Sequence, residues 1–230
     1  MKTIGLIGGM SWQSTVEYYR IINETTNERL GGSHSARCVL YSFNFAEIEK
    51  LQVEGKWDEL TRLIAKAAQI LESADAEFIV ICTNTLHKLA DDIQKNVKIP
   101  ILHIVDAVAE KIVENRFSKV GLLGTKFTME EDFYKKRLKE KYNIEVIIPD
   151  KEEREAIHNI IYNELCLGSI KPSSKEKFLN IIKNLNTKKA EGVILGCTEI
   201  PLLVKDEDVD IPLFDTTTIH AKAAVEFALR

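Results

Sequence analysis

The sequence of 230 residues lacks two features that would point to a membrane or to nucleic acid. It contains no apolar run near the roughly 20 residues that a membrane-spanning helix needs. It has no surplus of basic residues, because 31 Lys and Arg stand against 35 Asp and Glu for a net charge of −4. The first residues, Met1–Gly5, lead directly into a predicted strand and leave no room for a signal peptide. We therefore expect a cytoplasmic protein with no nucleic-acid or membrane partner.

Cysteine is scarce, with only four residues: Cys38, Cys82, Cys166 and Cys197. This number is too small for a disulfide framework, and no C-x-x-C or C-x-H spacing indicates a zinc site. We interpret Cys38 and Cys166 as buried, unreactive small residues. The glycines from Gly5 to Gly9 read G-x-x-G-G, which does not match the G-x-G-x-x-G pattern of dinucleotide-binding proteins. We interpret them as allowing the backbone to approach a small ligand.

One of the other two cysteines follows a short apolar run. Phe78–Ile81 is rich in β-branched residues, and Cys82 comes directly after it, before Thr83-Asn84-Thr85 and a helix predicted over 86–95. Cys82 should therefore lie where a buried strand ends and a helix begins, which is where open α/β sheets bind ligands. The helix N-terminus should also favour the thiolate form.

The same arrangement recurs in the second half of the chain. Gly192–Glu199 is again an apolar run followed by Cys-Thr, and Cys197 lies 197 − 82 = 115 positions after Cys82, half of the 230 residues. The segments 4–9 and 120–125 also resemble each other, as do the Pro-containing segments 99–102 and 211–214. Three matched landmarks at nearly one offset indicate an internal duplication.

Strands and helices alternate through both halves, so the sequence predicts the α/β class. We expect two similar lobes related by a pseudo-twofold duplication, each with a mostly parallel sheet flanked by helices. The first lobe should comprise 1–104 plus 214–230, and the second 105–213, with the active site in the cleft between them. Strands are predicted at 2–7, 36–43, 78–81, 99–104, 120–125, 144–148, 193–195 and 211–214. Helices are predicted at 14–30, 57–74, 86–95, 106–115, 129–142, 151–165, 173–185 and 217–229, and a loop or short helix at 48–55.

Two thiols on opposite sides of one carbon permit a particular reaction. One thiolate removes a proton from a stereocentre, and the opposite thiol returns a proton to the other face, which inverts the configuration without redox change. The carbanion must be stabilised in advance. Backbone N–H groups at Thr83–Thr85 and Thr198–Glu199 could hold a carboxylate. Glu199 could either accept the substrate ammonium or orient Cys197.

Three motifs together resemble the aspartate/glutamate racemase family. They are Gly5–Trp12 (GLIGGMSW), Ile81–Thr85 (ICTNT) and Gly196–Ile200 (GCTEI), and they span most of the chain. The resemblance implies cofactor-independent racemisation of an amino acid, a homodimer, and Cys82 and Cys197 as the acid/base pair. It places the following residues at the substrate: Met10, Ser11, Trp12, Gln52, Thr83, Asn84, Thr85, Thr125, Thr198 and Glu199.

The match is closer to aspartate and broad-specificity racemases than to cell-wall glutamate racemases. Aspartate-specific members of the family tend to carry basic residues near the positions of Ile48 and Leu167, and an apolar Leu167 would not pair with a side-chain carboxylate. We therefore favour broad specificity. Two alternatives stay open: a related isomerase or decarboxylase of a small carboxylic acid, and a non-catalytic carboxylate-binding or thiol-sensing protein.

Three further residues have alternative interpretations. His87 could tune the Cys82 thiol, but a histidine on the helix surface is the simpler interpretation. Asp106 and Asp215 follow the two Pro-containing strands, and each could be a helix N-cap or a catalytic group.

Overall fold

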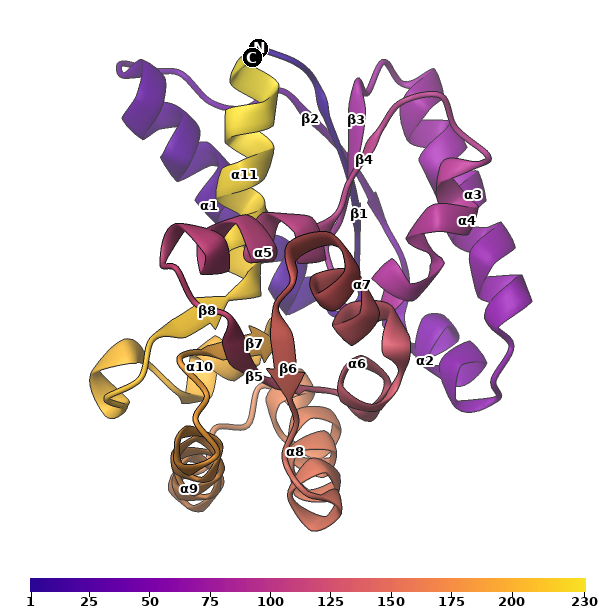
Figure 1. The fold of residues 1–230 in the computed structure, drawn as a ribbon. Helices are drawn as coiled ribbons and strands as arrows, with labels where there is room; N and C mark the ends of the chain where they lie inside the picture. The colour runs from indigo at the N-terminus through magenta and orange to yellow at the C-terminus, as the bar shows by residue number, and fades with distance from the viewer. The chain divides into compact units, whose positions relative to one another are not determined.

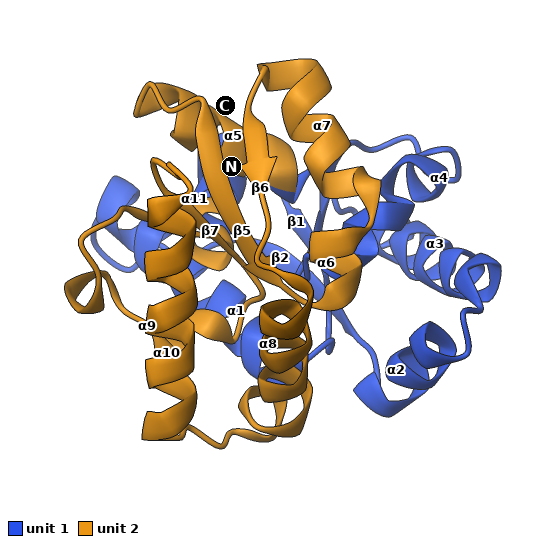
Figure 2. Cartoon of the chain, turned by 60° about the horizontal axis from the view of Figure 1, so that its bottom comes forward, with its two compact units in different colours: residues 1–104, 220–230 blue, residues 105–219 orange.

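The computed structural model describes all 230 residues and divides them into two compact units. Unit 1 comprises Met1–Ile104 and His220–Arg230, and unit 2 comprises Val105–Ile219 (Figure 2). None of the helices combines the length and the apolar composition that crossing a membrane would require. The two chain ends lie side by side in unit 1, where the Lys2 N–H donates to the Ala228 carbonyl at 2.8 Å (Figure 1).

Unit 1 contains a parallel sheet of four strands in the order β2-β1-β3-β4 (Figure 1). The strands are β1 (Ile4–Gly8), β2 (Cys38–Ser42), β3 (Phe78–Ile81) and β4 (Ile101–Leu102). Both central strands are buried along their whole length. Burial on both faces explains why they read as continuous apolar runs rather than as alternating patterns.

Helices cover both faces of this sheet. They are α1 (Trp12–Leu30), α2 (Phe45–Val53), α3 (Trp57–Ser73), the 3₁₀ helix η1 (Thr85–Leu89), α4 (Ala90–Gln94) and most of α11 (Thr216–Leu229). Alternate residues of β3 enter two separate apolar clusters. Ile79 and Ile81 pack with α3, whereas Val80 and Cys82 pack with α1 and α11. The Cys82 side chain therefore belongs to the α1 and α11 face.

Unit 2 repeats the architecture with a second parallel sheet, ordered β6-β5-β7-β8. Its strands are β5 (Lys119–Gly124), β6 (Glu145–Ile147), β7 (Val193–Gly196) and β8 (Leu213–Asp215). Its helices are α5 (Ile104–Glu114), α6 (Lys126–Glu130), α7 (Asp132–Tyr142), α8 (Lys151–Asn163), η2 (Leu165–Leu167), α9 (Pro172–Thr187), α10 (Ile200–Leu203) and η3 (Asp206–Asp208). The strand order matches that of unit 1 position by position, which confirms the predicted class of two similar α/β lobes.

The chain returns to unit 1 later than the sequence indicated. Residues 214–219 belong to unit 2, and the return falls at His220 rather than at residue 214. The physical reason is β8, which pairs in parallel with β7 from Leu213 to Asp215 and so completes the second sheet. The first crossing, after Ile104, falls where the sequence indicated.

Two predicted helices are broken in the structure. The helix expected at 86–95 consists of η1 followed by α4, and η1 starts without a side-chain cap. The helix expected at 129–142 is divided into α6 and α7, because Glu131 adopts an extended conformation with φ −74 and ψ 157. The segment at 48–55, predicted as a loop or short helix, lies mostly in α2.

Candidate active site

Cys82 is the first residue after β3 in unit 1, and its side chain is fully buried. Its N–H donates to the Ile7 carbonyl at 2.9 Å, and its carbonyl accepts from the Ser14 hydroxyl at 3.3 Å. The Cys82 Sγ donates to the Val80 carbonyl at 3.8 Å. These contacts fix the residue between the ends of β1 and β3 and the first turn of α1.

The ionisation state of Cys82 differs from the one that the sequence indicated. Burial raises the pKa of its thiol well above the usual value. The expected stabilisation of the thiolate by a helix N-terminus does not compensate, because the element that follows is a short 3₁₀ turn rather than a full helix. The Cys82 thiol is therefore protonated and neutral at pH 7.

The loop after β1 leads into α1, whose residue Ser14 contacts the Cys82 carbonyl. Ser11 caps α1, with its Oγ accepting from the Ser14 N–H at 3.5 Å, and the Gly9 N–H donates to Thr15 Oγ1 at 2.8 Å. Met10 and Ser11 are buried, whereas the Trp12 side chain is 64% exposed. Of the three predicted substrate-binding residues Met10, Ser11 and Trp12, only Trp12 therefore has a solvent-exposed side chain.

The glycines of this loop lie close to other parts of unit 1. A Cβ atom on Gly8 would lie 2.5 Å from the Thr15 side chain, and one on Gly9 would lie 2.2 Å from the Phe43 carbonyl oxygen. Gly9 also has φ +82, which disfavours any other residue. Gly8 and Gly9 therefore allow parts of unit 1 to pack closely against one another. This packing alone accounts for both glycines, and the approach of a ligand to them stays a prediction.

The other predicted residues of unit 1 differ in their exposure. Thr83 is half-buried, whereas Asn84 and Thr85 are buried at the start of η1. Gln52 is buried on α2, one turn after Ile48, which packs in the apolar cluster with α3. The structure thus groups Ser11, Cys82 and the Thr83–Thr85 turn at the carboxyl ends of β1 and β3, and Gln52 lies on a separate element.

Cys197 occupies the corresponding place in unit 2, directly after β7, and is 8% exposed. Its Sγ donates to Glu199 Oε2 at 2.9 Å. The Thr198 hydroxyl donates to the same oxygen at 2.8 Å. Glu199 is itself only 3% exposed. The buried Cys197 thiol, the half-buried Thr198 hydroxyl and the buried Glu199 carboxylate thus form one hydrogen-bonded group after β7.

The Cys197 thiol is also protonated and neutral at pH 7. Burial is the main reason that its pKa is raised, and the negative charge of Glu199 raises it further. The element that follows is the short helix α10, which begins without a side-chain cap. Thr125, the predicted residue at the end of β5, caps α6 through a 3.3 Å hydrogen bond from the Thr128 N–H.

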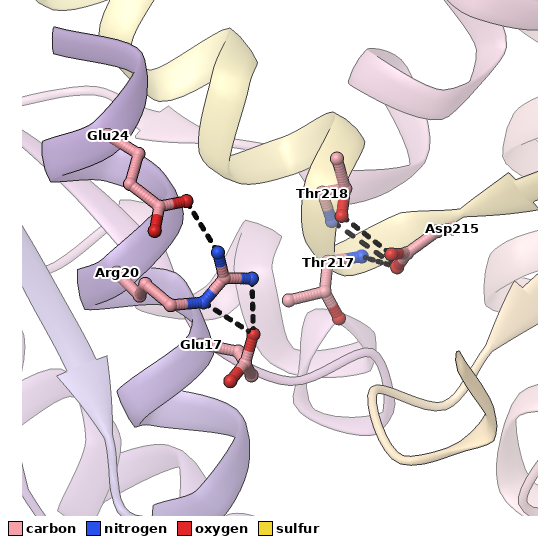
Figure 3. Close-up of polar contacts among 6 residues, drawn as sticks. All are labelled: Glu17, Arg20, Glu24, Asp215, Thr217 and Thr218. Carbon is pink, nitrogen blue, oxygen red and sulfur yellow. Dashed lines mark hydrogen bonds and ion pairs between the residues drawn. The ribbon is translucent and has the colours of Figure 1, made fainter. Parts of the chain in front are cut away.

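The two repeated aspartates are accounted for by structure. Asp215 accepts from the Thr217 N–H at 2.9 Å and from the Thr218 hydroxyl at 2.6 Å, so it caps the start of α11 (Figure 3). Asp106 instead forms a bidentate ion pair with Arg137, at 2.6 and 2.7 Å, which joins α5 to α7. Burial alone would raise the pKa of Asp106, but its contacts with Arg137 and Lys141 lower it.

Surface ion pairs and metal-binding groups contribute nothing further to the site. Figure 3 also shows Arg20 of α1 between Glu17 and Glu24, an exposed cluster on one helix. Exposed pairs of this kind stabilise a helix by a few tenths of a kcal/mol, roughly. No three His, Cys, Asp or Glu side chains are grouped in a way that could hold a metal ion.

The fold and the two cysteines define a class of duplicated α/β proteins with one buried thiol at the end of a central strand in each unit. A family model described as Asp/Glu/Hydantoin racemase matches residues 7–224, and the chain belongs to this family. It is an isomerase of the amino-acid racemase type.

Three relatives illustrate the similarity. The chain is 53% identical to a candidate Asp/Glu racemase from Yersinia pestis, over 100% of both chains and with a TM-score of 0.94. It is 41% identical to an aspartate racemase homologue from Pyrococcus horikoshii OT3, again over 100% of both chains, with a TM-score of 0.87. It is 24% identical over 228 residues to the broad specificity amino-acid racemase RacX of Bacillus subtilis (strain 168), which covers 96% of each chain.

Sequence reasoning missed two residues that hold the backbone around Cys82 in unit 1. Ser14 was predicted only as the first residue of the helix at 14–30, yet its hydroxyl donates to the Cys82 carbonyl. His87 was interpreted as a surface histidine, yet it is 2% exposed and bonds the turn that follows Cys82. The available signal was its position five residues after Cys82, but its burial depends on residues distant in the sequence.

Proposed function

We propose that this chain racemises amino acids without a cofactor, by a mechanism in which Cys82 and Cys197 act on opposite faces of the substrate α-carbon. One cysteine accepts the α-proton as a thiolate, and the other donates a proton as a thiol. The support comes from the duplicated fold, which sets one thiol at the equivalent strand end of each unit.

The observation that carries the proposal is the 2.9 Å hydrogen bond from Cys197 Sγ to Glu199 Oε2. A neutral thiol cannot remove an α-proton, so one of the two must first lose its own proton. Glu199 is placed to take that proton from Cys197. The Cys82 thiol lacks a comparable hydrogen bond to a carboxylate, because its Sγ donates only weakly, to the Val80 carbonyl at 3.8 Å.

Protons and electrons balance over the reaction. Glu199 takes the Cys197 proton, the Cys197 thiolate takes the α-proton as the Cα–H bond breaks, and Cys82 donates its thiol proton to the opposite face of the carbanion. Cys82 is left as a thiolate and Glu199 as a carboxylic acid. Glu199 then releases its proton to solvent while Cys82 takes one up, or the reverse cycle restores the starting state. A bound α-ammonium group near Glu199 would favour the charged form of Cys197, because opposite charges attract in a buried site.

We propose broad specificity for the substrate side chain. Ile48 is fully buried in the apolar core, and Leu167 is 74% exposed, so neither position offers a cation to a side-chain carboxylate. The name of the RacX relative points in the same direction. The name of the Pyrococcus horikoshii relative points to aspartate instead, so a direct test is needed.

The first test is chiral chromatography of the purified protein with each common L-amino acid, without pyridoxal phosphate or added metal. We expect D-forms of several amino acids with uncharged side chains. D-aspartate or D-glutamate alone would contradict broad specificity. No inversion of any amino acid would overturn racemisation and would favour a decarboxylase or isomerase, which a panel of diacids would identify.

The second test separates the two cysteines. Cys82→Ser and Cys197→Ser should each reduce racemisation by at least about 100-fold, because a hydroxyl is a poor acid and base. In deuterated water at high pH, where the remaining thiol ionises directly, each variant should still exchange the α-proton of one enantiomer. The exchanged enantiomer should differ between the two variants. Exchange of the same enantiomer by both variants would contradict the two-sided mechanism.

A further inference from the structure

His87 is buried in η1, where both of its ring nitrogens have backbone partners. Its Nε2 lies 3.1 Å from the Ile104 nitrogen, and its Nδ1 lies 2.7 Å from the Thr83 carbonyl oxygen. A backbone N–H can only donate, so Nε2 must be the unprotonated acceptor. The ring therefore carries its proton on Nδ1, which donates to Thr83. These two partners fix His87 as a neutral imidazole in one tautomer.

The Thr83 carbonyl is part of the turn that carries Cys82. The Thr83 N–H donates to the Ile81 carbonyl at 2.9 Å, and the Asn84 carbonyl accepts from the His87 N–H at 3.0 Å. His87 thus holds this turn twice, once through its ring and once through its backbone. No acid/base task remains for the ring, because both nitrogens are already bonded and the side chain is 2% exposed.

The His87 ring also contacts residues at the two points where the chain crosses between the units. Ile104 is the last residue of unit 1 before the first crossing, and His220 is the first residue after the return. The His87 ring packs edge-on against His220, with 5.5 Å between ring centroids. His220 is also fixed, because its Nδ1 lies 2.8 Å from Tyr18 Oη and its Nε2 lies 2.9 Å from the Leu102 carbonyl oxygen. His87 therefore joins the Cys82 turn to both crossings.

Unit 2 has no histidine at the position that corresponds to His87. The residue five positions after Cys197 is Leu202, which is 39% exposed on α10. Cys197 instead has the carboxylate of Glu199 beside its thiol. We infer that His87 is a positioning residue, which holds the Cys82 thiol in place by donating from Nδ1 to the Thr83 carbonyl. This inference rests on the proposed function, because it takes Cys82 as a catalytic thiol.

Two substitutions separate the contact of His87 with Thr83 from its contact with Ile104. His87→Asn sets an amide N–H near the position of Nδ1 and can still donate to Thr83, whereas His87→Gln sets its amide near Nε2 and keeps only the contact with Ile104. We expect the Gln variant to lose about 100-fold in kcat and the Asn variant to lose about tenfold or less, because a misplaced catalytic group is costly. Equal losses in the two variants would overturn the inference.

A second comparison excludes a general loss of structure. In deuterated water at high pH, where the remaining thiol ionises directly, the Cys197→Ser variant should exchange α-protons through Cys82, and the Cys82→Ser variant should exchange them through Cys197. Adding His87→Gln should slow exchange by about 100-fold in the first background and by less than about threefold in the second. Similar losses in both backgrounds would mean that His87 only stabilises the fold.

An NMR measurement keeps the inference separate from the proposed function. The ¹⁵N shifts of the wild-type His87 ring should report a neutral Nδ1–H tautomer, and the Thr83–Thr85 amides should exchange faster with solvent in His87→Gln than in His87→Asn. Failure of all α-proton exchange with this NMR result intact would overturn the proposed function alone. The opposite tautomer would overturn the inference about His87 whatever the activity.

Discussion

His220 is the residue for which the structure gives the clearest pH dependence of stability. Burial lowers its pKa to about 4, against about 6.5 in an unfolded chain. Between these values the unfolded chain binds a proton that the folded protein excludes. The free energy of unfolding should therefore fall, by about 3 kcal/mol from this residue, as the pH drops from about 6.5 to about 4. Below that pH its contribution changes no further.

The variant His220→Gln removes this titration while keeping a donor for the Leu102 carbonyl. In urea unfolding at neutral pH it should be less stable than the wild type, because it loses the bond to Tyr18 and some packing. The difference should narrow as the pH approaches 4. His34→Gln, at an exposed histidine, is the control and should follow the wild-type curve. A difference that stays constant with pH would contradict the assignment.

Residue identities were predicted from the sequence more reliably than residue environments. Both cysteines lie at strand ends as the β-branched runs indicated. The predicted thiolate at Cys82 was wrong, because burial raises the pKa of this thiol and outweighs the effect of the short 3₁₀ helix that follows. The prediction that His87 lies on the helix surface was also wrong. Its ring contacts Ile104 and His220, and His220 lies far along the chain. Local sequence carries no signal for such contacts.

At the scale of elements, the loop between β1 and α1 depends on Gly9. Its φ of +82 and the 2.2 Å separation between a Cβ atom and the Phe43 oxygen leave no room for alanine. Gly55 is the matched control in unit 1, because its φ is +68 but nothing lies within 4 Å of its Cβ position. We expect Gly55→Ala to cost about 1 kcal/mol and Gly9→Ala about 3 kcal/mol or more. Urea unfolding measures both, and equal costs would show that the contact with Phe43 relaxes freely.

Elements with a strong local boundary were predicted best. β3 was predicted residue for residue, because an apolar run is followed at once by a thiol and polar residues. β4 was predicted as 99–104 but pairs only at Ile101 and Leu102, because it is an edge strand with a single neighbour. The break at Glu131 between α6 and α7 was missed, since neither Gly nor Pro marks it. Such interruptions depend on tertiary packing.

At the scale of the whole molecule, the duplication was predictable because equal offsets survive sequence divergence. The strand orders of the two sheets confirm it. The return to unit 1 at His220 was not predictable, because β8 and α11 are adjacent in sequence and no turn residue marks the change of unit. The homodimer and the cytoplasmic location stay predictions. The halves have also diverged, with a carboxylate beside Cys197 and a buried histidine after Cys82.

That divergence leads to a prediction about the complete reaction. Glu199→Gln removes the proposed proton acceptor of Cys197 and also one of the causes of the raised pKa of this thiol. Burial is the larger cause and persists, so the thiol stays protonated at neutral pH. We therefore expect kcat/KM at pH 7 to fall by about 100-fold and to recover partly at high pH, where the thiol ionises directly. Glu176→Gln, with the same change of charge on the exposed face of α9, should match the wild type.

The loss should be the same in both directions, although Glu199 belongs to one unit. The two enantiomers have equal free energies, so the ratio of the two kcat/KM values is fixed by an equilibrium constant of unity for every variant. The α-deuterium exchange that precedes inversion is not bound by this rule, and it should slow mainly for the enantiomer that Cys197 deprotonates. Chiral chromatography and deuterium incorporation, followed together in Glu199→Gln, measure both quantities. Unchanged kcat/KM at neutral pH would mean that Glu199 does not take the Cys197 proton, whereas equal slowing of exchange for both enantiomers would assign it a role in binding the substrate.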